Sequence, residues 1–467
     1  MLVKKLAIIA FATHGALAGA ATIGLDVGFG TGGVALVGAT PVSGLLMHFV
    51  PAAGMAVQSD GKILLAGNTE GMTYGPSPHS TLVPAVGRLN ANGSWDTTFG
   101  DHGIFALTAN AAAPNGGDAT QVALQSDGSI VASGGIATFA GYIEPCVLLF
   151  KMNSAGALDT NFGGASAGAF CQYFGTFTNT YVNSPQTGLQ VADDDSLYVT
   201  GSMAFTNSFL GALARYTPGG DLDPAFGYLG VVTSDAFFVG IELQVDGNLV
   251  GAAGGNGTAY FSRFLPTGGL DWTFGGDGQF LFDLAGNQPY FERMRIDATG
   301  SFLATYSPHY ASDPSAFVLT RVTSQGAADV TFNDNAQQPG FPGYAAMPLP
   351  SGTGDFAIDA QPLSDGHIFL VGSKSFDTIY LARLANDASA DPSYGDPPTP
   401  GLAQYAIADT TNLPFATVID AQGRLLIAAG FAGANIGGGC TGIMRIIPDQ
   451  LFGGGFDAPA ATPTCPP

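Results

Sequence analysis

The polar and apolar positions of this chain recur as short apolar runs separated by a turn signal. AVQSDGKILLAG (56–67) and ALQSDGSIVASG (123–134) both place Asp-Gly between two stretches of β-forming residues. Gly accepts the positive φ that a two-residue hairpin turn requires, so each segment predicts a β-hairpin. Further copies occur at 243–254 and 362–372, with a less regular one at 418–430.

A second recurring element follows each hairpin. RLNANGSWDTTFG (88–100) has a basic residue, an Asp eight positions later and an aromatic residue three positions after that. The same spacing recurs at 151–163, 215–227, 263–275, 321–333 and 383–395. The basic residue ends an apolar run, and another short apolar run such as GIFAL (103–107) follows the loop. Each unit therefore predicts four strands joined as an antiparallel meander.

The number of units follows from the aromatic position of the repeat. It is occupied by Phe29, Phe99, Phe162, Phe226, Phe274, Phe332, Tyr394 and Phe456, eight copies that enclose seven intervals. Four-stranded units of this length predict a propeller, in which closure into a ring protects the sheet edges. We predict an all-β, seven-bladed β-propeller of four-stranded antiparallel blades, as a single domain over residues 22–467. The short interval 226–274, and Thr299-Gly300 in place of Asp-Gly, depart from the pattern.

The basic residue and the Asp of the repeat predict one ion pair per blade, because their offset across a tight loop is constant. The six local pairs are Arg88–Asp96, Lys151–Asp159, Arg215–Asp223, Arg263–Asp271, Arg321–Asp329 and Arg383–Asp391. In the last unit Gly453 stands eight residues after Arg445, whereas Asp26 in the first copy has no preceding Arg. We hypothesise that Asp26 meets Arg445 across the ring closure. The alternatives are independent surface charges, or a catalytic carboxylate, which an enzyme rarely needs in six copies.

The combined LDxxFG and QxDGKIL spacing resembles that of the bacterial delta-60 repeat proteins. The resemblance covers nearly the whole chain after the N-terminal segment. It implies a β-propeller-like exported protein, and it carries no catalytic residue over to this sequence.

The first twenty residues predict a signal peptide. Lys4 and Lys5 precede a short apolar core over 6–12, and Ala18-Gly19-Ala20 fits a signal peptidase site. We therefore expect a secreted or periplasmic protein, which includes attachment to the cell surface. No later apolar run reaches 18 residues, so we expect no membrane span.

Composition supports the β class and limits the partners. Gly is frequent at 68 residues, and charged residues make up only 11% of the chain, so few charged helix surfaces can form. The formal net charge of −22 repels phosphate backbones, which disfavours nucleic acid as a partner. The charge also suits solubility of an exported protein, calcium binding or a cationic partner.

The four cysteines occupy equivalent repeat positions. Cys146 and Cys171 are separated by 25 residues, and so are Cys440 and Cys465. Four cysteines allow three connectivities, and the repeat selects Cys146–Cys171 and Cys440–Cys465. Export favours disulfides, whereas a metal site would need closer spacing.

In an antiparallel meander alternate connections share one end of the ring. The Asp-Gly turns and the LDxxFG loops therefore share one end, and the variable loops share the other. Loops on a rigid scaffold often carry binding, and aromatic side chains suit glycan or peptide contact. The candidate binding residues are Tyr74, Tyr142, Phe177, Tyr181, Tyr306, Tyr310, Phe341 and Tyr344. The alternative is that these rings pack the loops onto the propeller.

Signals for catalysis are weak. The sequence contains no HExxH, GxSxG or phosphate-binding loop. Asp193-Asp194-Asp195 stands where other units have the hairpin turn, and adjacent residues there cannot all aim at one calcium ion. We predict no cofactor, and calcium is the metal that the acidic chain would take. The preferred function is a non-enzymatic binding or scaffolding module with a glycan or protein ligand. The alternative is a secreted hydrolase or lyase with an acidic, calcium-dependent site at the central channel.

Overall fold

The computed structural model describes most of the chain after residue 23. The described residues are 24–37, 40–42, 45–47, 49–72, 80–108, 117–137, 143–164, 167–173, 188–205, 208–235, 237–255, 258–282, 290–307, 316–332, 343–348, 356–374, 378–395, 401–405, 411–433 and 438–447. The predicted signal peptide lies outside them.

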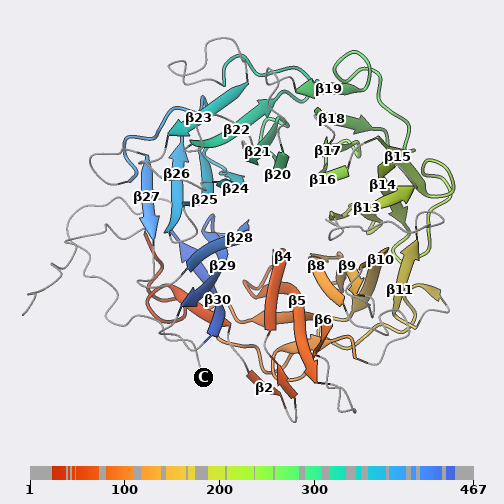
Figure 1. The fold of residues 1–467 in the computed structure, drawn as a ribbon, viewed down its shortest axis with the longest axis vertical. Helices are drawn as coiled ribbons and strands as arrows, with labels where there is room; N and C mark the ends of the chain where they lie inside the picture. Colours follow the sequence, from red (N-terminus) through yellow and green to blue (C-terminus); the bar gives the residue numbers. More distant parts are fainter. Residues whose placement is uncertain are drawn as a thin grey trace, which may run out of the picture.

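Seven four-stranded antiparallel sheets form a ring (Figure 1), which confirms the predicted seven-bladed β-propeller. Blade 1 consists of β4 (Phe49–Val57), β5 (Ile63–Met72), β6 (Ser80–Leu89) and β7 (Ile104–Ala106). Blade 2 consists of β8 (Gly117–Leu124), β9 (Ile130–Ala137), β10 (Ile143–Met152) and β11 (Ala169–Tyr173). Blade 3 consists of β12 (Leu189–Val191), β13 (Leu197–Phe205), β14 (Ser208–Tyr216) and β15 (Val231–Ser234). Blade 4 consists of β16 (Phe237–Leu243), β17 (Leu249–Gly255), β18 (Thr258–Phe264) and β19 (Gln279–Phe282).

The remaining blades repeat this order from the inner to the outer strand. Blade 5 consists of β20 (Tyr290–Ile296), β21 (Phe302–Ser307), β22 (Ala316–Val322) and β23 (Tyr344–Pro348). Blade 6 consists of β24 (Phe356–Pro362), β25 (Ile368–Lys374), β26 (Thr378–Leu384) and β27 (Leu402–Tyr405). Blade 7 is β28 (Thr411–Ile419), β29 (Leu425–Gly433), β30 (Gly438–Ile446) and β1 (Val34–Val37), and β2 (Thr40–Val42) pairs with β3 (Leu45–Met47) as a separate hairpin. No helix long and apolar enough to cross a membrane occurs among the described residues.

The ring closes because the N-terminal strand completes the last blade. β1 pairs antiparallel with β30, with Val34 opposite Met444 and Val37 opposite Thr441. Next to this pairing, the N–H of Asp26 donates to the carbonyl of Arg445 at 2.8 Å. The two ends of the described chain are therefore joined by β-ladder hydrogen bonds.

The core lies between neighbouring blades rather than inside one. At the join of blades 7 and 1, Ile63 and Leu65 of β5 pack with Leu426 and Ala428 of β29. The repeat aromatics are buried at such joins, and Phe29, Phe99, Phe226, Phe274 and Phe332 have no exposed surface. Burying the apolar face of each sheet against the next blade is the main stabilising contribution.

The hairpin turns and the LDxxFG loops share one end of the ring. In blade 1, Arg88 Nη1 on the loop side lies 3.4 Å from Gln58 Oε1 in the hairpin turn. Lys62 Nζ, which follows the same turn, lies 3.3 Å from the carboxylate of Asp96. We call this the clamp end, and the other two connections of each blade lie at the opposite end.

One of the two predicted disulfides is confirmed. Cys146 in β10 is bonded to Cys171 in β11, with the two Cα atoms 5.6 Å apart. The bond joins the outermost strand of blade 2 to the strand beside it. The predicted Cys440–Cys465 bond falls outside the residues whose side chains are described.

We predict that replacing both Cys146 and Cys171 by Ser lowers the free energy of unfolding by about 3 kcal/mol. The bond closes a loop of 25 residues, and its loss gives the unfolded chain more conformational freedom. Urea unfolding of the variant and of the parent protein measures the difference. Equal urea midpoints would show that β11 needs no covalent restraint.

Candidate functional site

The Asp of each clamp loop accepts a backbone N–H within its own turn. Asp96 Oδ1 accepts the N–H of Thr98 at 3.1 Å, and Asp329 Oδ1 accepts that of Thr331 at 2.9 Å. The same bond, to the residue two positions on, is made by Asp26, Asp159, Asp223, Asp271 and Asp391. This geometry leaves the second carboxylate oxygen for a cation, so Asp serves here better than Asn.

That second oxygen lies against the basic residue of the repeat. Short contacts join Arg88 Nε to Asp96 at 2.8 Å and Arg263 Nε to Asp271 at 2.8 Å. Arg215, Arg321 and Arg383 contact Asp223, Asp329 and Asp391 at 3.2, 2.7 and 3.2 Å. Lys151 Nζ reaches Asp159 only at 3.9 Å, because a lysine is shorter and has no guanidinium fork.

The ring closure uses the same contact between residues far apart in sequence. Arg445 Nε lies 2.9 Å from Asp26, and the two residues are 419 positions apart. Arg424 approaches the same carboxylate at 3.4 Å. Asp26 therefore replaces the local partner that Arg445 lacks.

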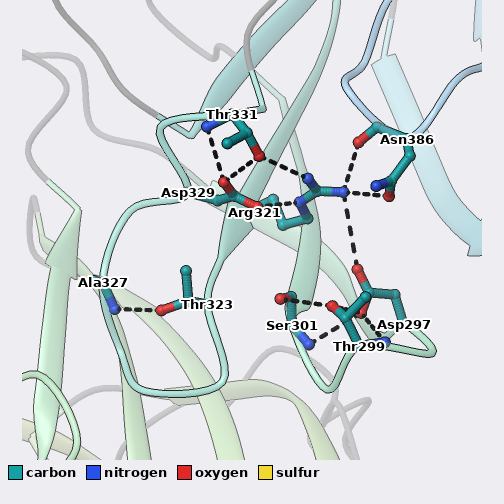
Figure 2. A network of polar contacts seen from close by, with 9 residues as sticks. All are labelled: Asp297, Thr299, Ser301, Arg321, Thr323, Ala327, Asp329, Thr331 and Asn386. Atoms are coloured by element: carbon teal, nitrogen blue, oxygen red, sulfur yellow. Dashed lines mark hydrogen bonds and ion pairs between the residues drawn. The ribbon is translucent and has the colours of Figure 1, made fainter.

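Arg88, Arg263, Arg321 and Arg445 also reach the next blade. Figure 2 shows Arg321 between Asp329 of its own blade and Asn386 of blade 6, whose backbone carbonyl accepts a bond from Nη1 at 2.6 Å. Arg263 donates to the carbonyl of Ser324 in the same way at 2.7 Å. A backbone bond lies beside that contact, from the N–H of Gly275 to the carbonyl of Gln325 at 3.0 Å. The clamp therefore joins blades as well as shaping a loop.

The pKa values of four clamp carboxyl groups, those of Asp96, Asp271, Asp329 and Asp391, are lowered. Burial alone would raise the pKa of Asp96, but hydrogen bonds from Thr98 and Lys62 and the charge of Arg88 lower it to about 2. The pKa of Asp271 is also lowered, mainly by the hydroxyl of Thr273. Because these folded-state pKa values lie below the ordinary one near 3.8, their stabilising contribution is present above that pH and is lost as the pH falls toward 2.

A second polar cluster lies on the inner strands and involves no clamp residue. Gln190, Glu242, Arg295 and Gln361 are each the penultimate residue of their inner strand, in blades 3 to 6. The corresponding residues of blades 7, 1 and 2 are Val418, Ala56 and Ala123. At this position the inner strands thus carry polar side chains in four consecutive blades and apolar ones in the other three.

Asp359 of β24 is the centre of this cluster and has no exposed surface. Arg295 donates to it from Nε at 3.2 Å and from Nη2 at 2.6 Å. The hydroxyl of Thr417 donates to it at 2.8 Å, and Gln361 Nε2 donates both to it and to Thr417 Oγ1. These donors satisfy the hydrogen-bonding capacity of both oxygens of the buried carboxyl group.

Glu242 of β16 is held less firmly. Its carboxylate lies 3.5 Å from Arg295 Nη1 and 3.5 Å from Gln190 Nε2, and its side chain is 13% exposed. Burial raises the pKa of Glu242 to about 7, and the nearby charge of Arg295 opposes the shift only in part. A carboxyl that exchanges its proton near neutral pH can act as a general acid or base.

Two of the three consecutive aspartates of blade 3 take separate roles. Asp194 contacts Arg215 Nη2 at 2.8 Å, whereas Asp195 accepts bonds from the N–H and hydroxyl of Ser126 in blade 2. Asp195 has a φ of 63°, so it occupies the turn position that Gly holds in other blades. Within the described ranges, no three His, Cys, Asp or Glu side chains are grouped to hold a metal ion.

The aromatic residues predicted for binding are mostly outside the described part of the chain. This applies to Tyr74, Tyr142, Phe177, Tyr181, Tyr310 and Phe341. Tyr306 belongs to β21, and Tyr344 begins β23, where its ring is half-buried against the core between blades 4 and 5.

Sequence reasoning missed the inner-strand cluster. Arg293 and Arg295 stand apart from the repeat arginines, and two basic residues in the short run YFERMRI (290–296) were the available signal. In a chain with so few basic residues, an alternating pair on an expected inner strand predicts buried partners.

Comparison with known proteins agrees with the fold. The family model DUF5122, a β-propeller domain of unknown function, matches residues 58–99. A comparison with curated proteins found no match.

Solved structures similar to this chain include propellers with and without a described activity. One is a protein of unknown function from Dyadobacter fermentans, 12% identical over 90% of this chain and 100% of that one, with a TM-score of 0.40. Another is the polysaccharide lyase Uly1, 10% identical over 85% and 90%, with a TM-score of 0.42. A third is a mutant of NanB sialidase from Streptococcus pneumoniae, 10% identical over 90% and 71%, with a TM-score of 0.43. Likeness at these levels says nothing about activity.

We predict that Arg321→Met lowers the free energy of unfolding by about 3 kcal/mol, because it leaves the carboxylate of Asp329 without its cation. The matched variant Lys151→Met removes a longer and more exposed contact, and its loss is about 0.5 kcal/mol. Urea unfolding of both variants at neutral pH makes the comparison. Equal losses would refute a special role for the buried arginine clamp.

We predict that ionisation of Glu242 contributes to the pH dependence of the free energy of unfolding. Its pKa is near 7 in the folded protein and ordinarily 4.5, so the folded state loses stability as the pH rises between these values. The groups that face it are Arg293, Arg295 and Asp359. Glu242→Gln removes this loss, which amounts to about 3 kcal/mol above neutral pH. Urea unfolding at pH 5 and pH 8 tests it, and parallel pH profiles for the two proteins would contradict it.

Proposed function

We propose that this protein is an exported, non-enzymatic binding or scaffolding module that binds a glycan or a protein through the loops opposite the clamp end. The difference between the two ends of the ring carries this proposal. At the clamp end the loops repeat one geometry and are used to join blades. At the opposite end the connections differ greatly in length. Residues 206–207 connect β13 to β14, whereas residues 174–188 connect β11 to β12.

Unequal loops on a rigid frame are what a binding surface requires. Each connection is fixed at both ends by paired strands, so its length and sequence can vary without affecting the blades. The sequence of this end is rich in Tyr and Phe with Asn, Ser and Thr nearby, a composition that suits stacking on sugar rings and hydrogen bonding to hydroxyls or peptide groups.

Two further parts of the proposal rest on the sequence. The repeats are of the delta-60 type, which their spacing supports. The protein is secreted or periplasmic, or attached to the cell surface, which the N-terminal charge and apolar run support.

A second candidate is a hydrolase or lyase that uses the inner-strand cluster. The observation that favours it is Glu242, a carboxyl with a pKa near 7 beside the guanidinium of Arg295. Such a group would donate or accept a proton in the cleavage of a polymer. Asp359, by contrast, is fully hydrogen-bonded and serves to orient Arg295.

We expect the purified protein to bind a component of a glycan array or of isolated peptidoglycan, with unchanged affinity in EDTA. The variant Phe177→Ser with Tyr181→Ser weakens binding about tenfold, because stacked aromatic rings dominate such contacts. The control Tyr228→Ser, which removes an exposed ring at the clamp end, leaves binding unchanged. Turnover of a bound polymer that is abolished by Glu242→Gln would instead establish the enzymatic candidate.

A further inference from the structure

The Lys and Arg side chains of this propeller make their contacts within the protein. Every Lys and Arg that follows residue 20 lies among the described residues, and none of these side chains is exposed. They form the clamps and the inner-strand cluster, or pack against an aromatic ring, as Lys374 does on Tyr380. Exposed aspartates, among them Asp246 and Asp277, are numerous. The described exterior therefore presents carboxylates and neutral groups, and its Lys and Arg side chains are at most partly exposed.

Exposed apolar side chains gather at the clamp end of blades 3 and 4. Tyr228 is 82% exposed and Trp272 is 67% exposed, although aromatic rings are usually buried in a soluble protein. Leu229 is exposed next to Tyr228 in the chain, and Val245 and Leu265 are exposed in two loops of blade 4. We call these five residues the blade 3–4 patch.

Close contacts place the loops of this patch next to one another. The N–H of Gly227, which precedes Tyr228, donates to the carbonyl of Thr267 in the loop of blade 4 at 2.7 Å. A side chain at Gly247, in the turn that carries Val245, would lie 3.5 Å from Pro266. Trp272 belongs to the same blade 4 loop and follows Asp271, which the clamp holds against Arg263. The patch is therefore a preformed surface on fixed loops.

The fold itself holds Leu229 in an exposed turn. Its φ of 52° is the left-handed conformation that Gly32, His102 and Ala167 also adopt directly before the equivalent glycine of their own repeats. The repeated turn therefore fixes the backbone here, and in this blade it carries a leucine whose side chain is 64% exposed.

The charges around the patch specify the partner. Asp246 flanks Val245, and Asp277 lies in the loop that follows Trp272. Both are exposed, and neither forms an ion pair with any Lys or Arg that follows residue 20, all of which lie in the described part of the chain. A second copy of this protein would bring carboxylates and no exposed cation, and a nucleic acid would bring phosphates. Both would be repelled.

We propose that the blade 3–4 patch docks a protein segment in which apolar side chains alternate with Arg or Lys. The apolar side chains cover Trp272 and its neighbours, and the cations pair with Asp246 and Asp277. Aromatic residues at the centre of an interface contribute most of its binding energy, and a charged rim mainly accelerates association. This docking surface is at the opposite end of the ring from the proposed ligand loops, so either proposal can fail alone.

The test uses the full mature protein and three short synthetic peptides, with binding measured by fluorescence anisotropy. In the first peptide Arg alternates with Leu and Trp; in the second Ser replaces Leu and Trp; in the third Glu replaces Arg. We expect the first peptide to bind at least about tenfold more tightly than the second, and the third not to bind. Binding of the first weakens as salt is raised, because the rim contacts are solvent-exposed.

Variants locate the contact. Trp272→Ser and Val245→Ser, in two different loops, each weaken binding of the first peptide about tenfold. The matched control is Val27→Ser, since Val27 follows the clamp Asp of another repeat and is 73% exposed. It leaves the affinity unchanged. Unaltered melting temperatures show that all three variants are folded.

Three results would overturn the proposal. Equal affinity for the first and second peptides would show attraction by net charge alone. A dimer in sedimentation that Trp272→Ser dissociates would make a second copy the occupant. Retention of full affinity by both Trp272→Ser and Val245→Ser would place the contact elsewhere.

Discussion

The architecture depends on one repeated interaction, a buried arginine that joins an aspartate of its own blade to a backbone carbonyl of the next. Arg88, Arg263 and Arg321 make both contacts. Since a buried charge is tolerated only when it is fully paired, each blade requires its neighbour in place before its own loop is stable. The same arginines lie over the repeat Phe rings, as Arg88 does over Phe99 at 4.3 Å, so the charged and apolar parts of each join form together.

Because the ring is closed, the last blade depends on the first in the same way as each blade depends on the next. Arg445 reaches the carbonyl of Ala91 in blade 1 as well as the carboxylate of Asp26, and β1 supplies the last strand of blade 7. The N-terminal segment is therefore part of two blade joins at once. Contacts this distant in sequence form late in folding, so the final closure is expected to be slow compared with formation of the individual hairpins.

Use of the cations inside the ring has a consequence for the exterior. The basic residues that follow residue 20 make their contacts at the joins, in the turns and on the inner strands, and exposed carboxylates such as Asp246 and Asp277 have no Lys or Arg paired with them. The two ends of the ring then have different chemistry. The clamp end presents an apolar patch with an acidic rim, whereas the opposite end carries unequal, aromatic-rich connections. Two surfaces on one rigid frame suit a protein that holds two partners in fixed geometry.

The sequence by itself determined the number of blades, the strand order within each, the clamp positions and the Cys146–Cys171 bond, because all of these repeat at a fixed spacing. It also indicated the Asp26–Arg445 contact, since each residue lacks a local partner. Tertiary structure alone decided which isolated side chains meet. Glu242, Arg295 and Asp359 come from three blades and lie outside the Asp-Gly and LDxxFG repeats of the sequence, and their contacts arise only when the inner strands converge. The blade 3–4 patch likewise exists only because packing of blade 3 against blade 4 brings the loop after Phe226 against the loop that contains Thr267.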